Sequence, residues 1–210
     1  MHELLIATTN QGKLREFSAI FAGLPLTIHS LRDRMIDDDV EETGTTFAEN
    51  ARLKAEYYAR RSGIVALADD SGLEVAALGG EPGVYSARYA GAGATDAQRN
   101  AFLLEKLHGI PFHARLARFI CVIAVATPDG AVAYAEGVLP GVIEFEPRGT
   151  GGFGYDPLFY LLDEHATLAE ISADRKNQIS HRARAAQAAR SILEHLATSG
   201  EIHDGERTTA

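Results

Sequence analysis

A short apolar run that leads directly into two carboxylates constrains this chain more than any other stretch. Residues 64–68 are apolar and lie between Gly63 and the segment Asp69-Asp70-Ser71-Gly72. The length of the run and its flanking glycines predict a buried strand that ends at an acidic tip. Ligands of open α/β sheets collect beyond such strand ends, and two buried carboxylates need positive charge nearby. The tip therefore indicates either a Mg²⁺ site or a solvated turn.

The composition narrows the class of protein. The chain has 210 residues, of which 46% are apolar, and this fits one domain with a full core. A formal net charge of −9 argues against general nucleic-acid binding, which needs a basic surface. The single cysteine, Cys121, lies in an apolar run, so we expect a buried thiol and a reducing compartment. We find no signal peptide and no apolar run that could cross a membrane, and therefore expect a cytoplasmic protein.

The first predicted strand, residues 4–7, is followed by a polar turn and a helix. Apolar residues at helical spacing between residues 14 and 21 predict the helix, and Asn10 is suited to be its N-cap. A turn in this position directs backbone N–H groups at the space above the sheet, where an anion can bind. Lys13 lies one turn into the helix. The turn therefore indicates a phosphate site or an ordinary helix cap.

A second helix opens with a capping box at Thr46-Phe47-Ala48-Glu49 and runs to about Ser62. Lys54 lies two turns into this helix. The acidic loop before it, residues 37–42, holds five acids in six residues. A charge run of this kind is usually solvated, but one or two of these acids could complete a metal site with Asp70.

The second half of the chain has antiparallel character. Residues 115–127 and 131–139 flank a Pro-Asp-Gly turn and predict a hairpin. Because the first half has a strand–helix–strand pattern, we expect a mixed sheet. A further capping box at Thr95 predicts a helix that runs to His108.

Two later segments indicate a binding site. The glycine-rich loop at residues 149–157 can lay Phe153 against a flat ring, or it is a flexible loop whose phenylalanine belongs to the core. One long helix is predicted from Ser172 to about Thr198, and its first half is basic. In this patch His181 lies beside an arginine, which makes it a better candidate than the other seven histidines.

Together these segments supply the groups that a magnesium-bound nucleoside triphosphate requires. The metal neutralises phosphate charge, lysines bind phosphate oxygens, and an aromatic ring stacks on the base. The candidate metal ligands are Glu41, Glu42, Asp69 and Asp70, and the candidate lysines are Lys13, Lys54 and Lys176. Periodicity alone does not say whether these segments converge.

Six motifs, in the same order along the chain, resemble those of the inosine triphosphate pyrophosphatase family. They are residues 8–16, 42–54, 69–73, 82–89, 151–157 and 180–182, and the resemblance extends from residue 4 to about residue 197. It implies an α/β fold with a long mixed β-sheet flanked by helices, in two lobes around a central substrate cleft. Residues 1–199 would form a single pyrophosphatase domain of two lobes, residues 200–210 a flexible C-terminal tail, and two chains a homodimer.

The resemblance also implies a reaction and a site. Members of the family hydrolyse the deaminated purine nucleoside triphosphates ITP, dITP and XTP to the monophosphate and pyrophosphate, with Mg²⁺ as cofactor, and so remove them from the nucleotide pool. Asp70 is implied as the general base and a Mg²⁺ ligand, with Glu42 as the second acidic contact. The implied substrate-binding residues are Thr8, Thr9, Asn10, Gln11, Gly12, Lys13, Lys54 and Lys176 at the phosphates, Ser71 beside the nucleotide, Phe153, Gly154, Tyr155 and Asp156 at the base, and His181 and Arg182 at its 6-oxo edge.

Two other functions compete with this one. A Maf-type pyrophosphatase would also release pyrophosphate but act on other nucleotides, and the Gly-Gly-Phe-Gly-Tyr-Asp and Ser-His-Arg motifs argue against it. A nucleotide-sensing module would bind triphosphate without hydrolysing it, and the presence of Asp70 and Glu42 argues against that role.

Overall fold

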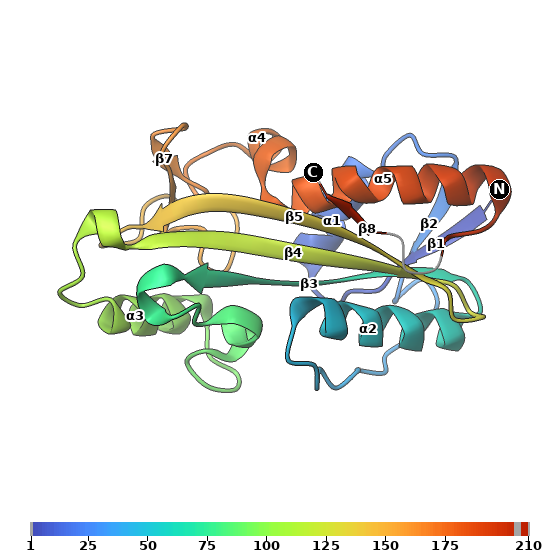
Figure 1. Cartoon of the computed structure of the whole chain (residues 1–210), viewed down its shortest axis with the longest axis horizontal. Helices are drawn as coiled ribbons and strands as arrows, with labels where there is room; N and C mark the ends of the chain where they lie inside the picture. The colour runs from blue at the N-terminus through green and yellow to red at the C-terminus, as the bar shows by residue number, and fades with distance from the viewer. Residues whose placement is uncertain (1, 204–206, 210) are drawn as a thin grey trace. The chain divides into compact units, whose positions relative to one another are not determined.

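The sheet is mixed, as the two halves of the sequence predict. The computed structural model describes residues 2–203 and 207–209, and within them a single eight-stranded sheet is flanked by helices (Figure 1). The strands are β1 (His2–Ile6), β2 (Leu26–Ser30), β3 (Val65–Val75), β4 (Leu116–Ala126), β5 (Val132–Ile143), β6 (Phe159–Leu161), β7 (Ala166–Thr167) and β8 (Arg207–Thr209). They are ordered β2-β1-β3-β4-β5-β6-β7, and β8 pairs with β5.

Five α-helices occur in the described part of the chain. They are α1 (Gln11–Ile20), α2 (Phe47–Ser62), α3 (Asp96–Lys106), α4 (Ala173–Ile179) and α5 (His181–Ser199), with short 3₁₀ turns at Ala76–Leu78, Gly83–Arg88 and Phe112–Ala114. None of the helices in the described ranges is long and apolar enough to cross a membrane.

The chain divides into two compact units. Unit 1 comprises Met1–Asp70, Cys121–Gly137 and His181–Ala210, and unit 2 comprises Ser71–Ile120 and Val138–Ser180. The long strands β3, β4 and β5 each contribute residues to both units.

Unit 1 is built on parallel strands covered on both faces. β1 pairs in parallel with β2 and β3, with Leu4 opposite Val65. Figure 1 shows α1 and α5 on one side of the sheet and α2 on the other. Phe17 of α1 and Ile192 of α5 pack in one cluster with Leu67 of β3, and all three are buried. Burial on both faces explains why these strands are apolar without alternation.

Local sequence signals place the helix ends correctly. Thr46 and Glu49 form the predicted capping box of α2, and Gly63 ends the helix in the left-handed conformation at φ 72°. This backbone conformation favours glycine because it has no Cβ. Asn10 caps α1 as predicted, and the Thr95 capping box opens α3.

Two sequence predictions about element boundaries are wrong. The strand that was expected to end before Asp69 continues as β3 to Val75. Aspartate is unfavourable in strands, but tertiary ion pairs at this position outweigh the local preference. The single helix expected from residue 172 is two helices, because Ser180 has extended backbone angles of φ −65° and ψ 159°. Ile179 and Ala183 keep helical spacing across this break, so the apolar pattern does not reveal it.

Unit 2 contains antiparallel strand pairs. β5 pairs antiparallel with β6, which pairs antiparallel with β7. Leu103 of α3 and Phe159 of β6 lie in its buried core together with Leu73 at the end of β3. Thus α3 and the sheet share one core.

The C-terminal segment contains a strand. β8 pairs in parallel with β5, with Arg207 opposite Tyr134, and the hydroxyl of Thr208 donates a hydrogen bond of 3.0 Å to the carbonyl oxygen of Ala188. Residues 204–206 and 210 of the predicted tail lie outside the described residues. The division at residue 199 stays a prediction.

Candidate active site

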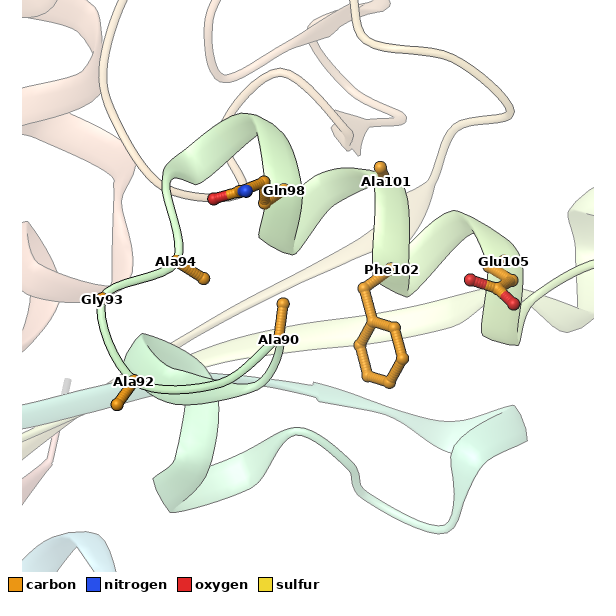
Figure 2. A pocket seen from close by; sticks show the side chains of 8 residues that line it. All are labelled: Ala90, Ala92, Gly93, Ala94, Gln98, Ala101, Phe102 and Glu105. Carbon is orange, nitrogen blue, oxygen red and sulfur yellow. The ribbon is translucent and has the colours of Figure 1, made fainter.

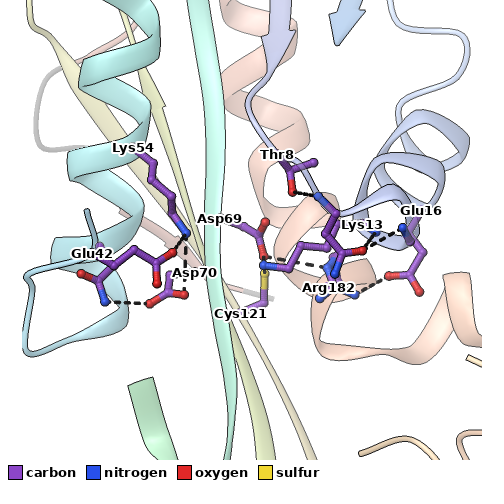
Figure 3. Close-up of polar contacts among 12 residues, drawn as sticks. Thr8, Lys13, Glu16, Glu42, Lys54, Asp69, Asp70, Cys121 and Arg182 are labelled. Carbon is purple, nitrogen blue, oxygen red and sulfur yellow. Dashed lines mark hydrogen bonds and ion pairs between the residues drawn. The ribbon is translucent and has the colours of Figure 1, made fainter. Parts of the chain in front are cut away.

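β3 directs its two adjacent carboxylates to opposite faces of the sheet in unit 1. Successive side chains of a strand alternate between the faces, so Asp69 and Asp70 cannot act as one pair at a strand tip. Figure 3 shows Asp69 pointing toward Lys13 and Arg182, and Asp70 pointing toward Lys54 and Glu42. The two carboxylates that the sequence analysis combined therefore belong to two separate clusters.

The Asp69 cluster lies on the face covered by α1 and α5. Lys13 Nζ is 2.8 Å from Asp69 Oδ2, and Arg182 Nε is 3.9 Å from the same oxygen. The thiol of Cys121 on β4 donates a weak hydrogen bond to Oδ2 over 3.8 Å. Burial alone would raise the pKa of Asp69, but the nearby Lys13, Arg182 and Lys54 outweigh it and hold that pKa well below its usual range. Asp69 is therefore ionised at neutral pH, and it pairs with two cations.

Arg182 is held from a second side as well. It forms a buried ion pair with Glu16 of α1, and its guanidinium lies 6.0 Å from the ring centre of Phe17. Burial would lower the pKa of Arg182, but Asp69 and Glu16 raise it. Sequence reasoning did not single out Glu16, although it lies three residues after Lys13 and therefore on the same helical face.

The first turn of α5 needs a glycine on the neighbouring strand. His181 and Arg182 open α5, and both are buried. A Cβ at Gly137 of β5 would overlap the backbone nitrogen of Ala185 and the carbonyl oxygen of His181. Gly137 thus permits the close approach that positions His181 and Arg182, a role with no signal in the sequence beyond a glycine within a strand.

The Asp70 cluster lies on the face covered by α2. The amide of Asn50 donates a 3.1 Å hydrogen bond to Asp70 Oδ2. Lys54 Nζ lies 3.8 Å from Asp70 Oδ1 and donates a 2.6 Å hydrogen bond to Glu42. One lysine therefore bridges two carboxylates from different segments, one from the acidic loop and one from β3.

The pKa values in this cluster are shifted in a way that suits a general base. Burial raises the pKa of Asp70, and Glu42 raises it further against the opposing effect of Lys54. Burial would lower the pKa of Lys54, but Asp70, Asp69 and Glu42 together raise it. A buried carboxylate with a raised pKa next to a fixed cation is typical of a functional site.

The donor set of this cluster fits Mg²⁺. Asp70 and Glu42 offer oxygen ligands only, and Mg²⁺ usually binds one or two carboxylates while water and substrate phosphates complete its shell. In residues 2–203 and 207–209, no three His, Cys, Asp or Glu side chains converge to enclose a metal ion. A magnesium ion here would depend on the substrate for part of its coordination.

The turn before α1 forms an ordinary helix cap. Asn10 Oδ1 accepts hydrogen bonds from the N–H groups of Gly12 and Lys13, at 2.8 and 3.2 Å, and Thr8 Oγ1 accepts one from the N–H of Asn10. The side chains of Thr9 and Gln11 are exposed. The turn is therefore rigid and accessible from solvent, and both properties are compatible with phosphate binding.

Unit 2 contains a separate cluster around the glycine-rich loop. Asp156 Oδ2 accepts hydrogen bonds from Lys176 Nζ at 2.6 Å and from the N–H of Phe153 at 2.8 Å. Lys176 Nζ also lies 4.6 Å from the centre of the Phe153 ring. Lys176 and Asp156 are buried. Lys176 is thus associated with the aromatic loop, whereas Lys13 and Lys54 belong to unit 1.

Tyr155 contacts the 3₁₀ turn at Gly83–Arg88. The hydroxyl of the buried Tyr155 donates a 2.9 Å hydrogen bond to the carbonyl oxygen of Ser86, and burial raises its pKa to about 12. Ser86 Oγ in turn accepts a hydrogen bond from the N–H of Leu73 in β3. Tyr155 therefore anchors the glycine-rich loop to the 3₁₀ turn that contains Ser86. Ser71 follows Asp70 in β3 and is half-buried.

A hollow elsewhere in unit 2 does not suit a polyphosphate. It has a volume of about 510 Å³ and lies between the segment at residues 90–94 and one face of α3 (Figure 2). Its lining is formed by Ala90, Ala92, Gly93, Ala94, Gln98, Ala101, Phe102 and Glu105. This lining carries one carboxylate and no cation, so it would repel a triphosphate.

Comparisons with known proteins all point to the same family. The model of the Ham1 family matches residues 4–192. A dITP/XTP pyrophosphatase from Geobacillus kaustophilus is 54% identical over 185 residues, which cover 88% of this chain and 91% of that protein.

Solved structures agree with this match. A HAM1 protein from Coxiella burnetii superposes with a TM-score of 0.85 at 43% identity, over 92% of this chain and 98% of that one. A nucleoside-triphosphatase (dITP/XTP pyrophosphatase) from Mycobacterium abscessus superposes with a TM-score of 0.71 at 39% identity, over 89% of this chain and 96% of that one.

Proposed function

The chain belongs to the Ham1 family, and on that premise we propose that it hydrolyses dITP, ITP and XTP to the monophosphate and pyrophosphate. It is a hydrolase of the nucleoside triphosphate pyrophosphatase class. The observation that carries the proposal is the Asp70–Lys54–Glu42 cluster, which joins a buried carboxylate of raised pKa to a cation and a second carboxylate. Such a cluster suits the activation of water beside a phosphate chain.

In the proposed reaction, water attacks the α-phosphorus of the nucleotide. A bond forms between the water oxygen and the α-phosphorus, and the bond from the α-phosphorus to the oxygen that bridges to the β-phosphate breaks. Asp70 takes the proton of the attacking water, and the amide of Asn50 holds the other oxygen of this carboxylate. Pyrophosphate leaves with the bridging oxygen.

Asp70 and Glu42 would hold Mg²⁺ in this site. When bound, the metal ion would neutralise charge on the triphosphate and on the leaving pyrophosphate. Lys13 and Lys54 would bind phosphate oxygens as point charges, and the fixed position of Lys13 against Asp69 supports this role. Residues 8–12 would offer backbone N–H and hydroxyl groups to the phosphates.

The purine is assigned to two groups of residues. Phe153 would stack on the base, and Gly154, Tyr155 and Asp156 would line its pocket with Lys176. His181 and Arg182 would donate hydrogen bonds to the 6-oxo oxygen. Adenine presents an amino group at this position, so it would leave those donors unpaired, at a cost of about 1–3 kcal/mol per lost bond.

Three finer features complete the proposal. We propose that the enzyme requires Mg²⁺, acts in the cytoplasm and forms a homodimer. Because the proposed contacts do not involve the ribose 2′-hydroxyl, ITP and dITP should be hydrolysed with similar kcat/KM.

The proposal is tested by pyrophosphate release from dITP, ITP, XTP, GTP and ATP, with Mg²⁺ and with EDTA. Release from dITP, ITP and XTP, little release from GTP and ATP, and no release in EDTA are expected. Equal turnover of all five nucleotides would leave the pyrophosphatase chemistry intact but contradict the base assignment. Tight binding without turnover would instead indicate a nucleotide sensor.

A further inference from the structure

Helix α3 presents two polar side chains to a single residue of the glycine-rich loop. Asp96 and Asn100 lie four residues apart and so share one face of the helix. Asp96 Oδ2 accepts a 2.7 Å hydrogen bond from the N–H of Gly154, and Asn100 Nδ2 donates a 3.1 Å hydrogen bond to the carbonyl oxygen of Gly154. One helix therefore binds both backbone polar groups of Gly154. We call Asp96 and Asn100 the α3 clamp.

The burial of Asn100 indicates that the hydrogen bond from its amide to Gly154 is the main reason for a polar residue at this position. Asn100 is only 5% exposed, and its Oδ1 has no hydrogen-bond partner among the described residues. An unpaired buried acceptor destabilises a protein, so an apolar side chain would pack here at a lower cost. The donor group toward Gly154 is the feature that an apolar residue would lose.

Asp96 is held in place for the same contact. Arg99 forms an ion pair with Asp96 and donates a 3.1 Å hydrogen bond to the carbonyl oxygen of Ala87. The carboxylate is thus fixed between a helix residue and the loop. An acid in the first turn of a helix also interacts favourably with the helix dipole, but that effect does not require a bond to Gly154.

The clamp acts on the residue next to Phe153. Gly154 has a left-handed backbone with φ 64°, and the N–H of Phe153 and the hydroxyl of Tyr155 are bound elsewhere, to Asp156 and Ser86. The contacts with Asp96 and Asn100 complete the set that fixes this part of the loop. Rotation of the peptide between residues 153 and 154 would turn the Phe153 ring.

We propose that the α3 clamp positions Phe153 for stacking on the purine, so that Asp96 and Asn100 are positioning residues for base recognition. The proposal rests on the proposed function, in which Phe153 binds the base. Neither residue would touch the substrate, and neither would act on the phosphates.

Three variants of Asn100 and Asp96 test the clamp. Asn100→Asp keeps the shape of the side chain and replaces the donor with an acceptor that faces the carbonyl oxygen of Gly154. Asp96→Ala removes the acceptor, and Asp96→Asn retains one and should rescue part of the effect. Glu105→Gln is the matched control, because Glu105 is exposed on the last turn of the same helix.

The readouts separate base recognition from general damage. We expect the KM for dITP to rise about tenfold (about 1.4 kcal/mol) in Asn100→Asp and Asp96→Ala, while kcat stays within about twofold of the wild type. The inhibition constant of inosine, which has a base and no phosphate, should rise to the same extent. That of tripolyphosphate, which has no base, should not change.

The outcomes distinguish this inference from the proposed function. If the wild type hydrolyses dITP and the clamp variants have the same KM for dITP as Glu105→Gln, the inference about the clamp is overturned and the proposed function is not. Equal weakening of inosine and tripolyphosphate would also overturn it, because that result indicates general disruption. A wild-type protein without activity on dITP would overturn both.

Discussion

Replacing Asp69 or Asp70 with asparagine should have different consequences for stability, although the residues are neighbours. Asp69→Asn removes the anion that pairs with Lys13 and Arg182 in the interior of unit 1. Breaking a buried ion pair usually costs about 3–5 kcal/mol. Glu16 remains beside Arg182 and an amide oxygen can still accept a hydrogen bond, so we expect a loss of about 2–3 kcal/mol in the free energy of unfolding.

Asp70→Asn should not destabilise the protein. Burial raises the pKa of Asp70, so its charged form is less favourable in the folded state than in the unfolded state. The amide removes this cost at pH 7 and can still accept the hydrogen bond from Asn50. We expect an unfolding free energy within about 0.5 kcal/mol of the wild type, or above it, and a fall in kcat of about 10²–10⁴-fold.

Urea denaturation at pH 7 measures the free energy of unfolding of both variants. Repeating it at lower pH tests whether the stabilising effect of Asp69 decreases with falling pH. The pKa of Asp69 lies below its ordinary value of 3.8 in the folded state, so its stabilising effect is complete above that value. The difference between the wild type and Asp69→Asn should therefore be constant down to about pH 4 and shrink as the pH falls further. Equal destabilisation by the two variants, or no loss in Asp69→Asn, would refute the division into two clusters.

Three further predictions concern the same unit. Gly137→Ala should lower the free energy of unfolding by at least about 1–3 kcal/mol and reduce kcat/KM, because a Cβ there overlaps the backbone at the start of α5. Urea titration measures the first effect, and a dITP assay measures the second. Lys54→Met should shift the acid limb of the pH profile of kcat/KM upward, since Lys54 lowers the pKa of Asp70; an unchanged limb would contradict this electrostatic role. Chelation of Mg²⁺ should abolish turnover while the melting temperature measured without nucleotide changes little, because the donor set is completed by substrate.

Local signals in the sequence were sufficient where the physical cause is local. The capping boxes at Thr46 and Thr95 and the C-cap at Gly63 predict the ends of their helices within a residue or two. Each involves atoms three or four residues apart, so the sequence contains all the information. The mixed sheet was predictable from the different patterns of the two halves of the chain, and the family was predictable because six ordered motifs match a known pattern.

Features that depend on distant residues could not be predicted. The strand continues through Asp69 and Asp70 because Lys13, Arg182 and Lys54 approach from three other segments. Alternation along a strand then separates the two acids, which sequence reasoning had combined in one metal site. The ion pair of Arg182 with Glu16 spans 166 residues. No periodicity reports such a contact.

Contacts in unit 2 show the same limit. Lys176 is expected at the phosphates from the family resemblance, and that role stays a prediction; its contacts with Asp156 and Phe153 could not be predicted from the sequence. Asp96 was recognised only as part of a capping box, although it also binds Gly154. A residue with one clear local role can have a second role that only the folded chain reveals.

The most direct test of the central claim is hydrolysis of dITP in water enriched in ¹⁸O, followed by mass spectrometry of both products. Attack of water on the α-phosphorus, with Asp70 as the base, places the label in dIMP and leaves pyrophosphate unlabelled. Label in pyrophosphate would mean attack at the β-phosphorus, and formation of dIDP and phosphate would mean cleavage at the terminal phosphate. Either result would contradict the pyrophosphatase mechanism proposed for this chain.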